Sequence, residues 1–327
     1  MAIISGELQL YYAAHRNQAT PAANGGRTSD NAVRCGQSGN IWPVVTAAQR
    51  AAGQTLAEKL YWRNRNAAGD TGADPWVALL TTTGGDEYEW IIGADQDGMQ
   101  SDLTGNERKY TAAKLAADAA AGATSLSITL PNAALASAFA AGDTVLVHAG
   151  GNTTETAAVS AVSGSGTSLT LTLSAGTANA WQASSAYVCS LYRPGAALAP
   201  SVANITQSGA GSYDFTTYPL ALDNRGAARQ RWTLTYTGAD ALEVSGDEFG
   251  SLGSFPIAQD IAPLDASGNP YFTLASGGHG TAHVSGDIIT FDTYAAAIPI
   301  WRFKSTPAGC AVMGTTSTSL RIQVESV

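Results

Sequence analysis

Short stretches of alternating apolar and polar residues, separated by glycine-rich turns, run through most of the chain. One pattern occurs twice, at residues 141–148 and 285–292, where a small residue, Gly and Asp precede a β-branched, partly alternating run. Gly and Asp are typical turn residues, and the run that follows has the period of a strand. Each copy therefore predicts a strand that leaves a hairpin turn, at the heart of a small β-module.

The spacing of these stretches predicts three modules. The first, residues 1–122, has expected strands at residues 8–14, 55–64, 76–80 and 88–92, of which the last three should share one sandwich sheet. The second, residues 123–193, is a compact insert with expected strands at residues 126–130, 144–148, 154–162, 169–173 and 186–192. Strands and turns at this spacing are typical of a small barrel or sandwich.

The third module, residues 194–327, begins with a Pro/Ala linker. It is expected to be a β-sandwich with strands at residues 213–217, 232–237, 241–244, 271–274, 288–291, 298–303 and 319–324, joined by glycine-rich connections at residues 246–253 and 275–280. The predicted fold class is therefore mainly β, with two or three small sandwich or barrel modules and one or two short helices.

Two segments have helical features. Thr46 and Gln49 have the spacing of a capping box, and Gly53 is a typical helix stop, so a short helix is expected between them. Residues 109–123 are rich in Ala, which favours helix, and this run predicts a short helix or a linker that ends at Gly122.

Residues 15–39 predict a long polar arm. They are rich in Asn, Gly, Thr, Ser and Pro, with a strong turn signal at residues 24–26. A loop longer than ~12–15 residues in a compact protein is usually functional or disordered. We expect this arm to contact a neighbouring molecule rather than to pack internally.

The composition suggests an uncharged surface. Only 13% of the residues are charged, against roughly 25% in an average globular protein. Such a composition is common where a surface is buried against copies or partners, but an ordinary Thr/Ser-rich β-protein also accounts for it. Both interpretations stay open at this point.

The net charge of −9 argues against a general electrostatic grip on nucleic acid. The local basic runs are confined to Arg63 and Arg65, and to Arg225, Arg229 and Arg231. An acidic surface would instead suit a duct through which DNA slides without sticking. We expect no sequence-specific binding of nucleic acid.

The three cysteines, Cys35, Cys189 and Cys310, are far apart and form no Cys-x-x-Cys pair. They predict free, buried thiols in a protein that folds in a reducing cytoplasm. The chain opens without a charged and then apolar leader, and no apolar run approaches the ~20 residues of a membrane helix. We therefore expect neither secretion by a signal peptide nor a membrane span.

Residues 93–106 resemble the start of a calcium-binding loop, because Asp95 and Asp97 alternate and precede Gly98. The twelfth position of such a loop requires a bidentate Glu, but here it is Asn106. An exposed polar turn is the favoured interpretation, and cation binding by Asp95 and Asp97 stays open.

His279 and His283 are four residues apart, which on a helix would place both on one face as metal ligands. The glycines around them argue against a helix, so a pair of exposed loop histidines is favoured. Ser165 stands in a Gly-Ser-Gly turn without a nearby histidine in the sequence, so it does not predict a nucleophile.

No catalytic, cofactor-binding or metal site is predicted, and we do not expect an enzyme. The chain has 26 Asp and Glu residues, which neither exclude nor indicate a glycosidase pair. Trp42, Trp76, Trp181 and Trp301 would stack on sugar rings if exposed, but tryptophan in a β-protein more often lies in the core.

Residues 40–46, Asn-Ile-Trp-Pro-Val-Val-Thr, together with Arg50, Gly53 and the expected strand at residues 59–66, resemble the opening of a family of structural proteins of long-tailed bacteriophages. The later segments at residues 232–246, 271–274 and 285–291 are similar to small β-modules of phage virion proteins, found in tails and in head decoration. No active-site residues carry over from this resemblance.

The resemblance implies a virion structural protein, folded in the host cytoplasm, that self-assembles in a long non-contractile tail as a tail tube or baseplate ring. Its partners would be copies of itself in a symmetric ring, held by strand-edge pairing and arms, and other phage tail proteins. Such a ring would be a passive conduit for DNA. A head decoration protein and a glycan-binding receptor protein at the tail tip are the alternatives.

Overall fold

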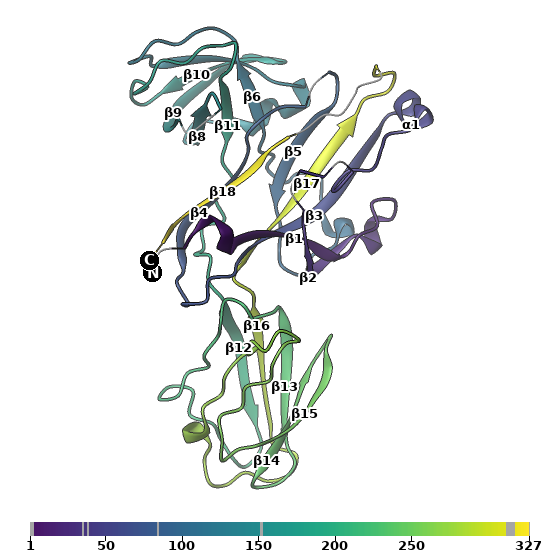
Figure 1. The fold of residues 1–327 in the computed structure, drawn as a ribbon, viewed down its shortest axis with the longest axis vertical. Helices are drawn as coiled ribbons and strands as arrows, with labels where there is room; N and C mark the ends of the chain where they lie inside the picture. The colour runs from purple at the N-terminus through teal and green to yellow at the C-terminus, as the bar shows by residue number, and fades with distance from the viewer. Residues whose placement is uncertain are drawn as a thin grey trace.

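The computed structural model describes residues 3–34, 36–37, 39–83, 85–150, 153–311 and 318–326. The chain forms three β-modules in a row: a barrel, a middle module and a C-terminal sheet (Figure 1). Helical structure is limited to one short α-helix and several 3-10 turns within the described residues. The prediction of a mainly β fold with small modules is confirmed.

The middle module has two layers. Its larger sheet has the order β2-β1-β3-β17-β5, with β1 Leu8–His15, β2 Gly25–Ala32, β3 Gln54–Asn64, β5 Tyr88–Gly93 and β17 Ala297–Thr306. The smaller layer pairs β4 Gly72–Leu79 with β18 Leu320–Ser326. Leu60, Val77 and Ile300 are fully buried between the layers, and Ile322 packs against them. The two layers therefore share one apolar core.

The sheet pairing differs from the predicted module boundaries. Strands β17 and β18 were expected in the C-terminal module, but the register pairs Ile300 with Leu60 and Ile322 with Val77. Strand β17 is buried on both faces, which suits the interior of a sheet. Local apolar patterning shows that a strand is buried, but not which sheet it joins.

The strands expected to share one sheet also separate. Strand β3 pairs with β1 and β17, β5 pairs with β17, and β4 lies in the other layer with β18. Strands β3, β4 and β5 were predicted to pair with one another. Instead, β17 pairs with β3 and β5, and β18 pairs with β4.

The predicted arm at residues 15–39 is held to the middle module at several points, although most of its described residues are exposed. Strand β2 pairs with β1, and η2 Pro21–Ala23 leads into it. Asn24 is fully buried and donates to the backbone of β3. The buried Glu58 carboxylate accepts hydrogen bonds from Arg16 and Gln18, both at 2.6 Å. A buried carboxylate needs such partners, and this requirement draws the polar segment onto the module.

The predicted short helix is confirmed as α1 Ala47–Ala52. The Thr46 hydroxyl accepts from the Gln49 amide at 3.2 Å, and the Gln49 side chain accepts from the Thr46 amide at 2.8 Å. Gly53 ends the helix with φ of +76°. This reciprocal cap is the one that the sequence spacing predicts.

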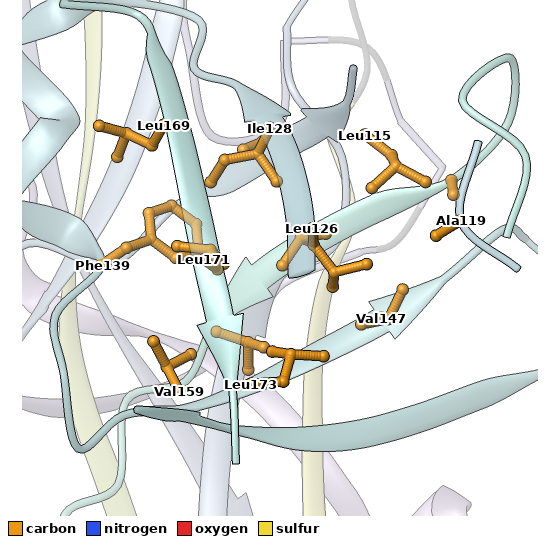
Figure 2. Close-up of a cluster of buried hydrophobic side chains, with 14 of the residues drawn as sticks. Leu115, Ala119, Leu126, Ile128, Phe139, Val147, Val159, Leu169, Leu171 and Leu173 are labelled. Carbon is orange, nitrogen blue, oxygen red and sulfur yellow. The ribbon is translucent and has the colours of Figure 1, made fainter. Parts of the chain in front are cut away.

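The second module is a closed barrel with the order β10-β7-β6-β11-β8-β9. Its strands are β6 Ala112–Leu115, β7 Ser125–Thr129, β8 Thr144–His148, β9 Thr154–Ser165, β10 Ser168–Leu173 and β11 Tyr187–Ser190. Alternating apolar side chains fill the interior, including Leu126, Ile128, Val147 and Leu171 (Figure 2). Phe139, which follows η4 Ala133–Ala138, contributes to the same core.

The Ala-rich run at residues 109–123 is a strand rather than a helix where β6 crosses it. Ala112, Ala113 and Leu115 are buried, while Lys114 between them is exposed. This alternation fits a barrel strand, and its pairing with β7 and β11 outweighs the helix propensity of alanine.

The C-terminal module has one sheet with the order β12-β16-β13-β14-β15. Its strands are β12 Ser201–Ser208, β13 Gln230–Tyr236, β14 Ala241–Gly246, β15 Gly250–Pro256 and β16 Ile288–Tyr294. One face is buried beneath loops that include η5 Ser276–Gly278. Isolated bridges link these loops, and the strands predicted at residues 213–217 and 271–274 contribute only to such bridges.

The repeated Gly-Asp pattern forms the same turn twice. The amides of Asp143 and Asp287 donate to the carbonyls of Ala140 and Val284, both at 3.2 Å. In return, the Asp143 carboxylate accepts a hydrogen bond from the Ala140 amide at 2.7 Å, and the Asp287 carboxylate accepts one from the Val284 amide at 3.1 Å. The glycine before each Asp has φ of +91° or +96°, where glycine is favoured.

Each repeated turn also docks on the neighbouring strand in the same way. Val159 in β9 and Tyr236 in β13 each exchange two backbone hydrogen bonds of 2.8–2.9 Å with their turn. The predicted strands follow as β8 and β16. Neither turn closes a hairpin, however, because the segment before it is a loop or a 3-10 helix rather than a paired strand.

Polar contacts join the middle module to the C-terminal module. Arg27 on β2 donates to both carboxylate oxygens of Asp247, at 2.8 and 2.7 Å, and Arg229 donates to Asp97 at 2.8 Å. The Arg27 guanidinium holds the pKa of Asp247 down at about 2. The segment predicted as an arm therefore serves as an internal connection between modules.

Candidate assembly interface

Sheet edges are the first surfaces to consider in a protein built from strands, because their backbone groups pair readily with another chain. The barrel is closed and presents no edge of its own. In the middle module, edge strand β2 carries Arg27 and Asp30, and β18 carries Arg321 and Glu325. Charged residues on an edge discourage pairing with another chain.

Both edges of the C-terminal sheet lack charged residues. Strand β12 reads Ser-Val-Ala-Asn-Ile-Thr-Gln-Ser, and β15 reads Gly-Ser-Leu-Gly-Ser-Phe-Pro. Both strands are largely exposed, and Ile205 on β12 exposes 39% of its surface. Each edge has one register shift, but residues 206–208 and 253–256 pair regularly with their inner neighbours. These segments leave two extended, uncharged edges on one sheet.

The outer face of the same sheet carries a row of hydroxyl groups. The row crosses all five strands through Thr206, Thr290, Thr233, Ser245 and Ser251, which are successive partners in the register. The hydroxyls of Thr206 and Thr290 are 2.7 Å apart. Arg231 and Glu243 are exposed on the same face beside this row, so the uncharged surface consists of the row of hydroxyls and the two edges.

Sequence patterning missed both edge strands. The β15 segment is expected to be part of a glycine-rich connection, since Gly250 and Gly253 dominate its local signal. Leu252 and Phe255 both pack against the module core although they are three residues apart. This spacing fits a strand that is interrupted by a bulge. In β12, Val202 and Ile205 gave a similar weak signal without clear alternation.

The predicted calcium-like loop encloses a lysine ammonium. Lys59 on β3 is fully buried, and its Nζ donates to the carbonyls of Gly26 at 2.9 Å and Gly98 at 2.7 Å. Burial lowers the pKa of Lys59 to about 8, although nearby carboxylates, including those of Asp97 and Asp95, oppose this shift. The ammonium therefore supplies a positive charge inside the loop.

Metal-ligand geometry is not found in the part of the chain that the structure describes: no group of three or more His, Cys, Asp or Glu residues is placed to hold an ion there. Asp95 and Asp97 are exposed, as expected for a polar turn. The Tyr61 hydroxyl donates to the Gln96 carbonyl at 2.7 Å and helps to hold this turn against β3.

The interpretation of His279 and His283 as exposed residues is wrong. His283 is only 5% exposed, and its ring stacks on Tyr236 with 3.8 Å between centroids. His279 is half-buried, and its Nδ1 is 2.7 Å from the Tyr236 hydroxyl. The inward face of β13 holds Tyr236 in the core, so the loop that packs over it buries both histidines.

Acid should weaken this histidine cluster. Burial, with a smaller effect of His283, lowers the pKa of His279 to about 4. The unfolded chain then binds more protons between pH ~6.5 and ~4, so stability falls as the pH falls through that window. Allowing for partial exposure, we expect His279 to account for a loss of about 2 kcal/mol in unfolding free energy.

This prediction is checked by urea unfolding of the wild type and His279→Gln at pH 7 and pH 4. The glutamine retains a hydrogen-bonding group towards Tyr236 but does not titrate. The variant should lose less stability on acidification than the wild type. Equal losses in both proteins would contradict the assignment.

The remaining candidate residues have structural surroundings. Trp76, Trp181 and Trp301 are at most 5% exposed, which confirms the core interpretation for these three. Half-buried Trp42 donates from its indole to Glu89 at 3.1 Å. Ser165 is exposed at the end of β9, in the hairpin to β10.

The cysteine prediction holds in part. Cys189 and Cys310 are free thiols, and burial raises the pKa of Cys189. Cys310 is partly exposed, which corrects the expectation that it is buried. Cys35 lies outside the described residues.

The chain matches no protein-family model, no curated protein and no solved structure. Across the residues that the structure describes, no helix is long and apolar enough to cross a membrane.

Proposed function

We propose that this chain is a structural subunit of a bacteriophage virion that self-associates in a long non-contractile tail, as a tail tube or baseplate ring. The pair of uncharged edges on one sheet, β12 and β15, carries this proposal. The resemblance of residues 40–66 and of the later β-segments to virion proteins adds to it. The proposal assigns the chain no catalytic activity and no cofactor.

The topology sets the geometry of the proposed contact. Strands β12 and β15 run in the same direction, because four antiparallel pairings separate them. A ring needs a head-to-tail contact, which would join β15 of one copy to β12 of the next as a parallel pair. A two-fold contact between two β15 strands would instead be antiparallel and would stop at a dimer.

Lysines on the edges should block assembly. Ile205→Lys on β12 and Ser254→Lys on β15 each place a charge on an exposed strand. We expect each to raise the protein concentration needed for assembly by roughly tenfold or more, a change of about 1.4 kcal/mol per contact. Light scattering and negative-stain microscopy across a concentration series would measure this and show rings or stacked tubes for the wild type.

Ser163→Lys is the matched control, because Ser163 is exposed on β9 of the closed barrel. It should leave assembly unchanged. The proposed contact would be refuted if the wild type stayed monomeric, or if Ile205→Lys and Ser254→Lys assembled at the same protein concentration as the wild type. Binding of a monomer or trimer to empty capsids would favour head decoration, and adsorption to host cells would favour a receptor role.

A further inference from the structure

A cleft of about 470 Å³ lies where the middle module meets the C-terminal module and the linker that leads to it. Its lining comes from the loop after β5 at residues 94–97, the linker after β11 at residues 192–197, and the junction of β16 and β17 at residues 294–299. Small-molecule sites are typically clefts of ~300–1,000 Å³ and are often found at domain junctions. The size and position of this cleft therefore suit a ligand.

Two tyrosines give the cleft firmly held aromatic surfaces. Tyr192 packs against Gly93, where any Cβ atom would lie 2.6 Å from the tyrosine hydroxyl oxygen. The Arg229 guanidinium lies 4.6 Å from the ring centre of Tyr294. Both tyrosines are partly exposed and line the cleft. Such rings offer an apolar face together with a polar hydroxyl.

The carboxylates of the cleft already have positive charges beside them. Asp97 is 2.8 Å from Arg229 and 3.3 Å from Arg27. The charges of Asp95 and Asp97 also act on the buried Lys59 ammonium. A cationic ligand would find little uncompensated negative charge, whereas the carboxylate oxygens remain good acceptors for hydroxyl groups.

Aromatic faces next to hydrogen-bond acceptors match the chemistry of a sugar, which has apolar C–H faces and a rim of hydroxyls. Pro194 and Pro299 add rigid apolar surface to the same cleft. We propose that this cleft binds a neutral saccharide, with Tyr192 and Tyr294 packing against the ring and Asp95 accepting hydrogen bonds from its hydroxyls. The inference does not depend on self-association through the C-terminal sheet.

Saturation-transfer NMR of the full chain with glucose, galactose, N-acetylglucosamine and rhamnose at millimolar concentration tests this proposal. At least one of these sugars should receive saturation. Tyr294→Ala and Asp95→Asn should each weaken its binding by roughly tenfold. Asp95 is exposed, so its variant keeps the fold even if Tyr294→Ala disturbs the packing of Arg229.

Tyr218→Ala is the control, because Tyr218 is an exposed tyrosine of the C-terminal module outside the cleft. It should bind the sugar as the wild type does. The proposal fails if none of the four sugars binds, if binding is unchanged in Asp95→Asn, or if choline binds in the cleft and the sugars do not. A protein that binds sugar but never assembles would overturn only the assembly proposal.

Discussion

Replacing Arg302 by alanine should lower the free energy of unfolding by about 3–5 kcal/mol, because the change leaves a buried charge unpaired. Arg302 on β17 is 5% exposed, and its Nε donates to Glu89 at 2.7 Å. Glu89 is equally buried and also accepts from Trp42 and Thr318. Urea unfolding at neutral pH would measure the loss.

A double variant shows how much of the loss comes from the unpaired Glu89 charge and how much from the lost packing of the Arg302 side chain. Glu89→Gln combined with Arg302→Met removes both charges but keeps an acceptor for Trp42, so it should recover more than half of the loss. Arg321→Ala on β18 is the control, because Arg321 contacts Gln323 at 3.2 Å and the Trp76 ring at 5.7 Å, and neither partner is a carboxylate that the change would leave unpaired. A loss as small as that of the control would show that the buried pair is not a major source of stability.

Replacing Trp232 by alanine should cost about 3–5 kcal/mol and unfold the C-terminal module first, because it opens a large cavity. The indole is fully buried on the inner face of β13, and its Nε1 donates to the Thr293 hydroxyl at 2.8 Å. Phe272 packs edge-on against it, with 5.0 Å between ring centres. Calorimetry and limited proteolysis would measure the loss and locate it.

Phe249→Ala provides the matched comparison. Phe249 contacts the same indole, with ring centres 6.0 Å apart, but exposes 42% of its surface. Its loss should cost about 1–2 kcal/mol, because only slightly more than half of its surface leaves water on folding, whereas Trp232 is fully buried. If the two variants were equally destabilised, the core around Trp232 would not be the main support of this module.

Short-range signals in the sequence predicted local structure well. The capping residues Thr46 and Gln49 located α1, and the repeated Gly-Asp pattern located β8 and β16, because each signal acts within a few residues. Alternating apolar residues located the barrel strands for the same reason. The barrel was one of the two architectures that this spacing favoured.

Long-range pairing could not be predicted in this way. The join between β17 and β3 links residues more than two hundred positions apart, such as Ile300 and Leu60. The burial of His283 and the ammonium of Lys59 inside the Asp95 loop likewise depend on residues that only the fold brings together. The edge strands β12 and β15 were missed because glycine and polar residues mask their weak alternation.

The two ends of the barrel lie side by side. Strand β6 begins next to the end of β11, and Ser190 donates from its amide to the Thr111 carbonyl at 3.0 Å. A segment whose ends meet can be removed or exchanged without stretching the rest of the chain. Related chains could therefore lose residues 112–189 or carry another unit there, while the middle module and the C-terminal sheet keep their connection.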